Sequence, residues 1–152
     1  MFFIDVKGEE EVAAKIVLLN QFSQAAVKKQ VNRAALAVQK GARERCPVDT
    51  GRLRSSIRVT FVDRMVRLTA EVGTTVEYAP YVEYGTRPHA LPSGALTGWA
   101  RRHGIPAYLV ARAISQRGTP PRPFLYPAWE EERPRFLLAM QLAILEAERK
   151  AA

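Results

Sequence analysis

The side chains that could support catalysis are few in this chain, and they do not cluster in the sequence. Its only cysteine is Cys46, and its two histidines are His89 and His103. A hydrolase needs a nucleophile beside a base, and the sequence offers Cys46 with a histidine, or Asp49 and Glu83 with a histidine. It contains no H-x-x-H or C-x-x-C spacing for zinc and no G-x-x-x-x-G-K-[ST] loop for phosphate. We therefore predict no enzyme activity, no metal and no cofactor.

Each catalytic candidate also has a structural interpretation, which we favour. A single cysteine is usually a packed thiol, and it excludes an intrachain disulfide. Asp49 precedes Gly51 in a turn, where a carboxylate bonds downstream backbone amides and a glycine adopts the required angles. Glu77 and Glu83 could act as acid and base, but we expect a structural ion pair with an arginine of the segment 52–54.

The charge of the chain is strongly positive and unevenly distributed. Its 152 residues carry a net charge of +8, and no acidic residue occurs between Glu83 and Glu130. The arginines of that interval are Arg87, Arg101, Arg102, Arg112, Arg117 and Arg122. We interpret them as a solvated or partner-facing basic surface, with salt-dependent contact with DNA as the alternative. No helix-turn-helix, zinc-finger or RNA-recognition signature accompanies these arginines.

The length and composition predict a single domain over residues 1–152. Hydrophobic residues make up 47% of the chain, which suffices for a core. Apolar runs stay below the roughly 18 residues that cross a bilayer, so we expect no membrane contact. The first residues lack a basic leader followed by a long apolar stretch, so no secretory signal is expected. One cysteine fits synthesis in a reducing cytoplasm.

Hydrophobic periodicity predicts a long helix followed by a hairpin. Apolar residues recur at a period near 3.6 and predict a helix from about Glu9 to Arg45, with alanines that keep one face thin. Residues 2–6 could form a short strand or an arm before it. From Leu53 the period becomes two, which predicts an antiparallel hairpin over residues 53–72 with one face on the long helix. We expect a loop slightly longer than two residues after Asp63.

Residues 87–121 are predicted to form a basic insertion rich in glycine and proline. Two short helices fit between these breakers, one over residues 93–103 and one from Pro106 to Gly118. The preceding segment 76–84 reads as a strand or turn that leads into one helical turn. We expect the insertion to be more mobile than the sheet and to make intermolecular contacts.

The last element is a helix from about residue 127, which Pro134 either kinks or restarts. It carries two apolar stripes: Leu137, Met140 and Ile144, and Leu138, Leu142 and Leu145. The first stripe suffices for packing on the rest of the chain. The second belongs either to a wide core face or to a contact with a neighbouring subunit.

Three short segments occur in a recognisable order. The first is Pro47, Val48, Asp49, Thr50 and Gly51, followed by Leu53, Ser56 and Ile57. The second is Tyr78 and Ala79 with Val82, Glu83, Tyr84, Gly85 and Thr86. The third is Arg122, Pro123, Phe124, Leu125, Tyr126, Pro127 and Ala128. Together they resemble the tailed-bacteriophage head–tail joining and tail-completion proteins, a gene-product-ten-like neck family.

The resemblance implies an α+β fold in which the long N-terminal and C-terminal helices pack on a small antiparallel sheet. It also implies a structural virion protein that forms a ring, sixfold in the virion, from subunits that are monomers in solution. Its partners would be head-closure or portal-side proteins and tail-terminator or tail-tube proteins, in the neck or tail. The subunit would be made in the host cytoplasm. The alternative is a non-specific nucleic-acid-binding accessory protein.

The basic insertion departs from the family pattern because it is longer than in the plainest members. This longer insertion does not change the predicted sheet. The family pattern gives no guide to the ring contacts of this region. The residues that we expect at an interface are Arg52, Arg54, Arg58, Arg101, Arg102, Leu138, Leu142 and Leu145.

Overall fold

The computed structural model of the chain describes residues 21–64 and 67–151. Its elements are, in order, α2 (Gln21–Arg45), α3 (Arg52–Ser56), β1 (Arg58–Arg64), β2 (Arg67–Gly73), α4 (Ala79–Tyr84), α5 (Thr97–His103), α6 (Ala107–Arg117) and α7 (Leu125–Ala151). This is the predicted α+β class, with two long helices, one hairpin and a helical insertion. The predicted helix start near Glu9 and the strand or arm over residues 2–6 lie outside the described residues.

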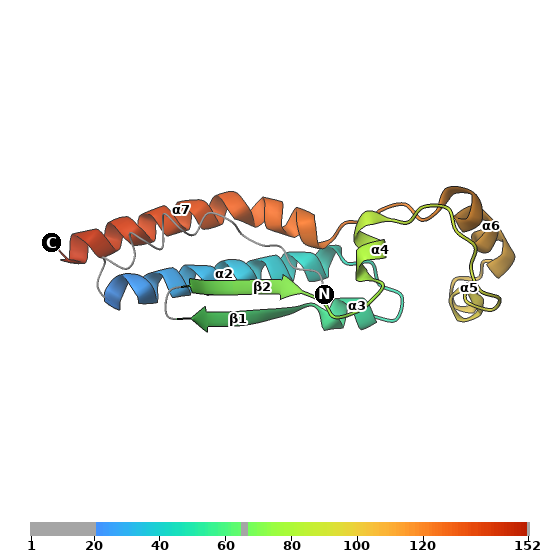
Figure 1. Ribbon diagram of the computed structural model, residues 1–152, viewed down its shortest axis with the longest axis horizontal. Helices are drawn as coiled ribbons and strands as arrows, with labels where there is room; N and C mark the ends of the chain where they lie inside the picture. The colour runs from blue at the N-terminus through green and yellow to red at the C-terminus, as the bar shows by residue number, and fades with distance from the viewer. Residues whose placement is uncertain (1–20, 65–66, 152) are drawn as a thin grey trace.

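The long helices α2 and α7 lie side by side in opposite directions and form the long axis of the molecule (Figure 1). Their buried residues are mostly small: Ala34, Ala35, Val38 and Ala42 on α2, and Ala128, Ala143 and Ala147 on α7. A Cβ atom on Gly41 would lie 3.3 Å from the Cβ of Ala128, so the two backbones approach closely there. The thin alanine face therefore serves the close helix contact that the sequence predicts.

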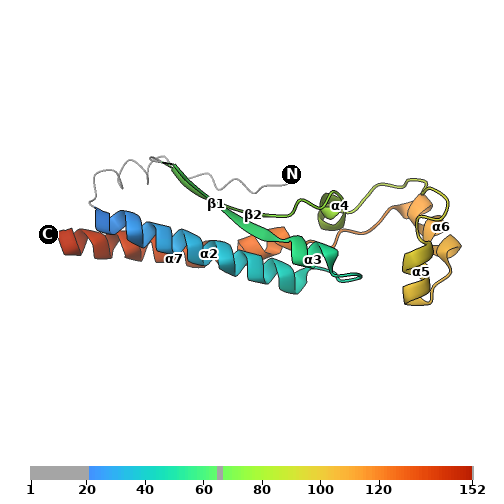
Figure 2. The same cartoon turned by 90° about the horizontal axis from the view of Figure 1, so that it is seen from below.

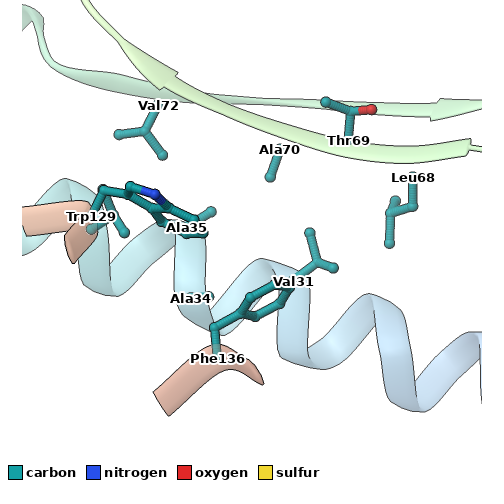
Figure 3. Close-up of a pocket in the computed structure, with 10 residues that line it drawn as sticks. Val31, Ala34, Ala35, Leu68, Thr69, Ala70, Val72, Trp129 and Phe136 are labelled. Carbon is teal, nitrogen blue, oxygen red and sulfur yellow. The ribbon is translucent and has the colours of Figure 1, made fainter. Parts of the chain in front are cut away.

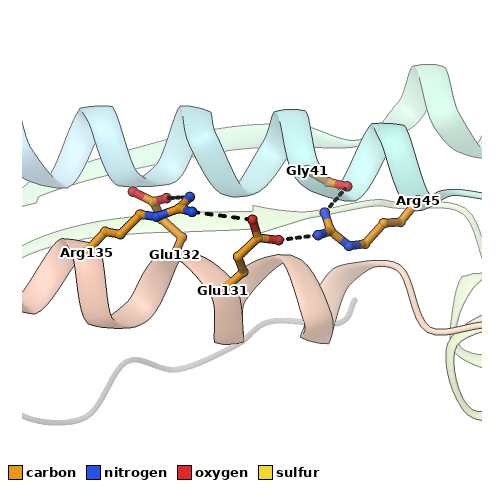
Figure 4. A network of polar contacts seen from close by, with 5 residues as sticks. All are labelled: Gly41, Arg45, Glu131, Glu132 and Arg135. Carbon is orange, nitrogen blue, oxygen red and sulfur yellow. Dashed lines mark hydrogen bonds and ion pairs between the residues drawn. The ribbon is translucent and has the colours of Figure 1, made fainter.

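Charged side chains reinforce the helix pair (Figure 4). Arg45, at the end of α2, donates hydrogen bonds to the carbonyl oxygen of Gly41, at 3.1 Å, and to Glu131 of α7. Glu131 also pairs with Arg135, which in turn pairs with Glu132, both at 3.6 Å. Mostly exposed ion pairs of this kind contribute little individually. Their main consequence is that the acidic start of α7 is neutralised within the subunit.

The hairpin confirms the predicted alternation from residue 58 onward. Its antiparallel register pairs Val59 with Val72 and Phe61 with Ala70, so these apolar side chains share one face. The register extends to the last residue of β1, so Asp63 lies in the strand and the longer loop predicted after it is wrong. Continuing the ladder pairs the backbone groups of these residues, which a longer loop would leave unpaired.

The hairpin lies over α2, with β2 facing the helix pair (Figures 2 and 3). Between them is an apolar cavity of about 70 Å³, lined by Val31, Ala34, Ala35, Val38, Leu68, Thr69, Ala70, Val72, Trp129 and Phe136. Figure 3 shows Trp129 and Phe136 reaching into this space from α7. The two aromatic rings therefore connect all three layers: hairpin, α2 and α7.

Residues 52–56 form the short helix α3, where the sequence pattern predicts the first residues of a strand. The backbone amide of Ser55 donates to the carbonyl oxygen of Gly51, at 2.9 Å, and closes a helical turn. Leu53 and Ile57 are four residues apart, a spacing that places two side chains on one strand face or on one side of a helix. Both are buried, so the pattern predicted their burial correctly and their element wrongly.

The tightest packing lies at one end of the helix pair. The largest fully buried side chains are Phe124, Ile57 and Leu125. They belong to a cluster with Val38, Ala42, Cys46, Leu53, Val76, Ala79 and Ala128. Because these residues come from α2, α3, α4, α7 and the loops between them, one core joins the four helices at this end.

The faces of α7 differ in part from those predicted. The buried face runs through Ala143 and Ala147, with Phe136 half-buried, and Leu137 is 51% exposed. The prediction that Leu137 belongs to the core stripe is therefore wrong, although Met140 and Ile144 are half-buried. Small residues occupy the buried face of α7 because α2 approaches closely and leaves no room for leucine. The helix continues through Pro134 rather than restarting there.

The insertion over residues 87–121, hereafter the basic arm, projects from the end of the molecule (Figure 1). Its helices α5 and α6 confirm the two predicted helices, and Gly104 ends α5 in the left-handed conformation with φ of +66°. The first helix begins at Thr97 rather than near residue 93, because turn hydrogen bonds occupy the preceding residues. The arm thus forms a small helical unit at one end of the rest of the described chain, which we call the body.

The loop glycine Gly51 yields the first testable prediction. It has φ of +79°, and a Cβ atom there would meet nothing within 4 Å, so a side chain costs backbone strain without a clash. We expect Gly51→Val to lower the free energy of unfolding by roughly 1–3 kcal/mol. Gly51→Asn should cost clearly less, because asparagine tolerates left-handed angles. Urea denaturation measures both, and a valine variant as stable as wild type would contradict a constrained turn.

Candidate functional site: the junction with the basic arm

The three sequence segments that resemble the phage family converge at the junction between the body and the basic arm. The first segment forms the loop after α2, the second forms α4, and the third leads into α7 (Figure 1). The chain leaves the body just after α4 and returns just before α7. The junction therefore decides how the arm is held.

The carboxylate of Glu83 caps the N-terminus of α7. It accepts hydrogen bonds from the backbone amides of Phe124 (2.8 Å), Leu125 (3.0 Å) and Tyr126 (2.8 Å). The first amides of a helix have no partner within the helix, and the fourth position here is Pro127, which has no N–H. Every amide donor of the first turn is thereby satisfied. Glu83 is 3% exposed, so the three charge-assisted bonds and the positive helix end stabilise a buried charge.

The expected ion pair between Glu83 and Arg52 or Arg54 is wrong. A buried carboxylate needs several donors, and the start of α7 offers three amides at fixed positions. One signal in the sequence could have indicated this partner. The residue before α7 is Phe124, which cannot cap a helix, so a long helix begins there without a local capping side chain.

Backbone contacts close the base of the arm. The amide of Arg122 donates to the carbonyl of Val82 at 2.8 Å, and Thr86 pairs with Thr119 in an antiparallel bridge. The two threonine hydroxyls lie 2.9 Å apart. A Cβ atom on Gly118 would lie 1.9 Å from the carbonyl oxygen of Thr86, so only glycine allows this crossing. The chain therefore enters and leaves the arm through one narrow point.

A second contact ties α5 to the loop after α2. Arg102 donates from Nε to Asp49 at 2.9 Å and from its terminal nitrogen to the other carboxylate oxygen. His103 Nε2 lies 3.9 Å from the same carboxylate, and its ring stacks on Trp99 with centroids 4.3 Å apart. The hydrogen bond from Arg102 lowers the pKa of Asp49, so this carboxylate is ionised at neutral pH. The expectation that Asp49 bonds its own downstream backbone is wrong, because Arg102 occupies both oxygens.

An open cleft of about 410 Å³ lies between this loop and α5. Its lining consists of Pro47, Val48, Asp49, Thr50, Gly51, Arg52, Leu53, Tyr78, Val82, Trp99, His103 and Arg122. The lining combines guanidinium groups with aromatic rings. Its chemistry suits contact with an anionic or aromatic group of a partner, and it places no nucleophile beside a base.

The catalytic sets considered from the sequence are not assembled in the described residues. Cys46 is buried and its pKa is raised by burial, which disfavours the reactive thiolate. Glu83 is engaged by the start of α7, and Asp49 by Arg102. His89 is exposed, and its ring nitrogen lies 2.9 Å from the carbonyl oxygen of Arg87. Within the described ranges, no group of three side chains could hold a metal ion.

The other predicted motif residues have structural positions. Leu53 and Phe124 lie in the core, while Pro123 and Tyr84 are exposed. Ser56 places its hydroxyl 2.7 Å from the carbonyl oxygen of Leu53 and 2.6 Å from the hydroxyl of Thr74, which links α3 to the end of the hairpin. Gly85 has φ of +73° and ends α4 as predicted.

The residues predicted at an interface are exposed and divide into three groups. Arg52, Arg54 and Arg58 lie on α3 and β1, Arg101 and Arg102 on α5, and Leu138, Leu142 and Leu145 on α7. Arg102 is engaged by Asp49, whereas Arg101 has no ion pair in the described part of the chain. The structure thus separates a basic arm from an apolar stripe.

A family profile described as "Bacteriophage HK97-gp10, putative tail-component" matches residues 10–85. The match covers the loop after α2, the hairpin and α4 with Glu83, and it ends where the basic arm begins. No curated protein and no solved structure matches the chain. Among the described residues, no helix is both long enough and apolar enough to cross a membrane.

The Glu83 cap is tested by a matched pair of substitutions. Glu83→Gln replaces one acceptor oxygen with an amide that faces backbone N–H donors, so we expect the free energy of unfolding to fall by roughly 2–4 kcal/mol. Glu77→Gln is the control, because Glu77 is exposed and precedes α4. Chemical denaturation followed by circular dichroism compares the two. Equal stability of the two variants would show that the cap does not hold α7.

Substitutions at two neighbouring arginines of α5 test the contact between α5 and the body. Arg102→Gln removes the partner of Asp49, while Arg101→Gln removes the same charge and leaves the contact intact. We expect trypsin to cut first within residues 87–121 in every variant, and faster in Arg102→Gln. Preferential cutting within residues 53–72 would contradict this layout, and equal rates for both variants would contradict the role of Arg102.

The same contact should respond to acid. The pKa of Asp49 is lower in the folded chain than in the unfolded chain, so the contact stabilises docking above the ordinary aspartate pKa of about 4. This stabilisation of docking is lost as the pH falls through the lowered pKa of Asp49. Hydrogen exchange in α5 should therefore accelerate at acidic pH, relative to the intrinsic rate, in wild type and not in Arg102→Gln.

Proposed function

Because the chain belongs to the HK97-gp10-like family of bacteriophage tail components, it is a tail-related structural protein of a phage virion, and we propose that it forms a homo-oligomeric ring at the head–tail interface. In this proposal the ring is sixfold, completes the neck or tail, and joins the tail to the DNA-filled head. Its neighbours are head-closure or portal-side proteins and tail-terminator or tail-tube proteins. The subunit is made in the host cytoplasm as a monomer and acts by contact rather than catalysis.

The observation that carries this proposal is the outer face of α7. Leu138, Leu142 and Leu145 are 58%, 53% and 58% exposed, and Leu137 adjoins them at 51%. The opposite face of the helix packs on α2 through small residues, so these leucines lie outside the core that the described residues form. A continuous apolar stripe of this kind favours a protein contact.

A ring requires two different surfaces on each subunit, because a stripe that packs on its own copy closes into a pair. The hairpin supports the proposal by supplying the second surface. Phe61 of β1 is 45% exposed, and β1 has no strand partner other than β2 in the described ranges. An open strand edge with an exposed aromatic ring accepts contacts from another chain. We propose that the α7 stripe of one subunit packs on the hairpin of the next.

The second candidate function is a free nucleic-acid-binding accessory protein, which the basic arm favours. The two functions differ in where the protein is found. A ring protein must be present in purified virions at a fixed number of copies, and a free accessory protein must be absent from them. Quantitative mass spectrometry of purified particles separates the two.

The stripe is tested by Leu138→Glu with Leu142→Glu. Both side chains are more than half exposed, so we expect the subunit to fold and remain soluble, with an unchanged circular dichroism spectrum. We expect joined particles to be absent by electron microscopy, because charged side chains would be buried in the ring contact. Gln141→Glu on the same helix is the control, since it adds charge without removing a leucine.

Two results would contradict this assignment. If the double variant unfolds, the leucines belong to the core of the subunit. If it folds and particles with joined tails still form, the ring contacts lie on another surface.

A further inference from the structure

The basic arm has an excess of positive charge that nothing in the described chain neutralises. Its arginines are Arg87, Arg101, Arg102, Arg112 and Arg117, and Arg122 follows at its base. All are exposed, and the arm contains no acidic residue. Of these arginines, only Arg102 has a carboxylate partner among the described residues, and that partner is Asp49 of the body. The arm is therefore built to meet negative charge from outside the subunit.

A second copy of the chain is a poor source of that charge. Each copy carries a net charge of +8, so a ring of identical subunits accumulates positive charge rather than cancelling it. Many carboxylates of the body are already engaged: Glu44 by Lys40, Glu130 by Arg133, Glu131 by Arg45 and Arg135, Glu132 by Arg135, and Glu83 by backbone amides. The net positive charge of each copy therefore favours an external polyanion as the partner.

The exposed face of α6 carries side chains that suit a nucleic-acid backbone. Along this helix Ala107, Val110, Ala111 and Ile114 are half-buried, and the exposed side chains are Tyr108, Leu109, Arg112, Ser115, Gln116 and Arg117. Tyr108 is 70% exposed and stands one turn before Arg112. Arginine, tyrosine, serine and glutamine side chains are the types that bind phosphate and sugar groups along DNA.

The junction holds α5 and α6 beyond the body. The bridge between Thr86 and Thr119 fixes the base of the arm, and the pair of Arg102 with Asp49 fixes α5. Figure 2 shows α5 and α6 beyond the ends of α2 and α7, at the tip of the molecule. A rod-shaped partner can therefore approach α6 without meeting the body.

We infer that the basic arm is a binding surface for the phosphate backbone of double-stranded DNA, with the outer face of α6 at its centre. The inference rests on the proposed function in one respect, that a ring at the head–tail interface lies where DNA is present. The binding itself does not require the ring, because each subunit carries its own arm. It is independent of sequence, since the arm carries no groove-reading element beyond its short helices.

The test measures the binding of purified subunit to a short fluorescein-labelled DNA duplex by anisotropy over a range of salt concentrations. The logarithm of the affinity should fall linearly with the logarithm of the salt concentration, by about 0.9 per neutralised phosphate. The arm variant changes Arg101, Arg112 and Arg117 to glutamine and should reduce this slope by about 2.7. The control variant changes Lys29, Arg33 and Arg149, which are exposed on α2 and α7 of the body, to glutamine and removes the same charge. We expect its slope to stay close to that of wild type.

Three other outcomes would contradict the inference. Equal losses of slope in the two variants would mean that overall charge, not the arm, binds DNA. Absence of binding at low salt would exclude DNA as the partner. Binding of a polyglutamate peptide as tight as that of the duplex would identify an acidic protein surface instead. Because the assay uses unassembled subunits, a failure of the α7 variant to join particles leaves it unaffected, and the reverse also holds.

Discussion

The carboxylate of Glu83 determines where α7 begins, and the rest of the structure depends on that position. A charge that is 3% exposed is costly unless it is fully bonded, and here three backbone amides and the positive end of a long helix surround it. The amides of Phe124 and Leu125 are held at the point where their side chains enter the core. From that point α7 runs back along α2, so a single cap sets the register of the helix pair.

The cap also explains how the body tolerates the basic arm. Because Glu83 binds the start of α7, the end of α4 and the beginning of α7 are neighbours in space. The chain can leave the body after α4 and return at α7 without disturbing either element. The bridge between Thr86 and Thr119, with glycine at its crowded crossing, closes this exit. The family match ends at residue 85, so it includes neither the basic arm nor α7.

The molecule thus separates two kinds of surface. The body carries an apolar stripe on α7 and an open hairpin edge, both suited to contact with protein. The arm carries arginines of which only Arg102 has an ion pair among the described residues, and an exposed tyrosine, and it lies at the other end of the molecule from the end of α7 (Figure 1). In the proposed ring, charge repulsion between basic arms would oppose assembly, whereas apolar burial along α7 would favour it. A polyanion at the arms would relieve the repulsion, so the two surfaces of the proposed ring would support each other.

Local pattern in the sequence predicted the end of α2 at Arg45, the strand alternation that the structure confirms from residue 58, and the glycine and proline limits of α5 and α6. These features depend on period, turn chemistry and breakers, which act between near neighbours. Only the tertiary structure decided that residues 52–56 are helical, because a spacing of four residues between Leu53 and Ile57 suits a helix and a strand equally. It also decided the partners of Asp49 and Glu83, which lie 53 and about 40 positions away in the chain. Charge and motif marked both carboxylates as important, but a long-range partner follows from the packed arrangement of the elements and not from local spacing.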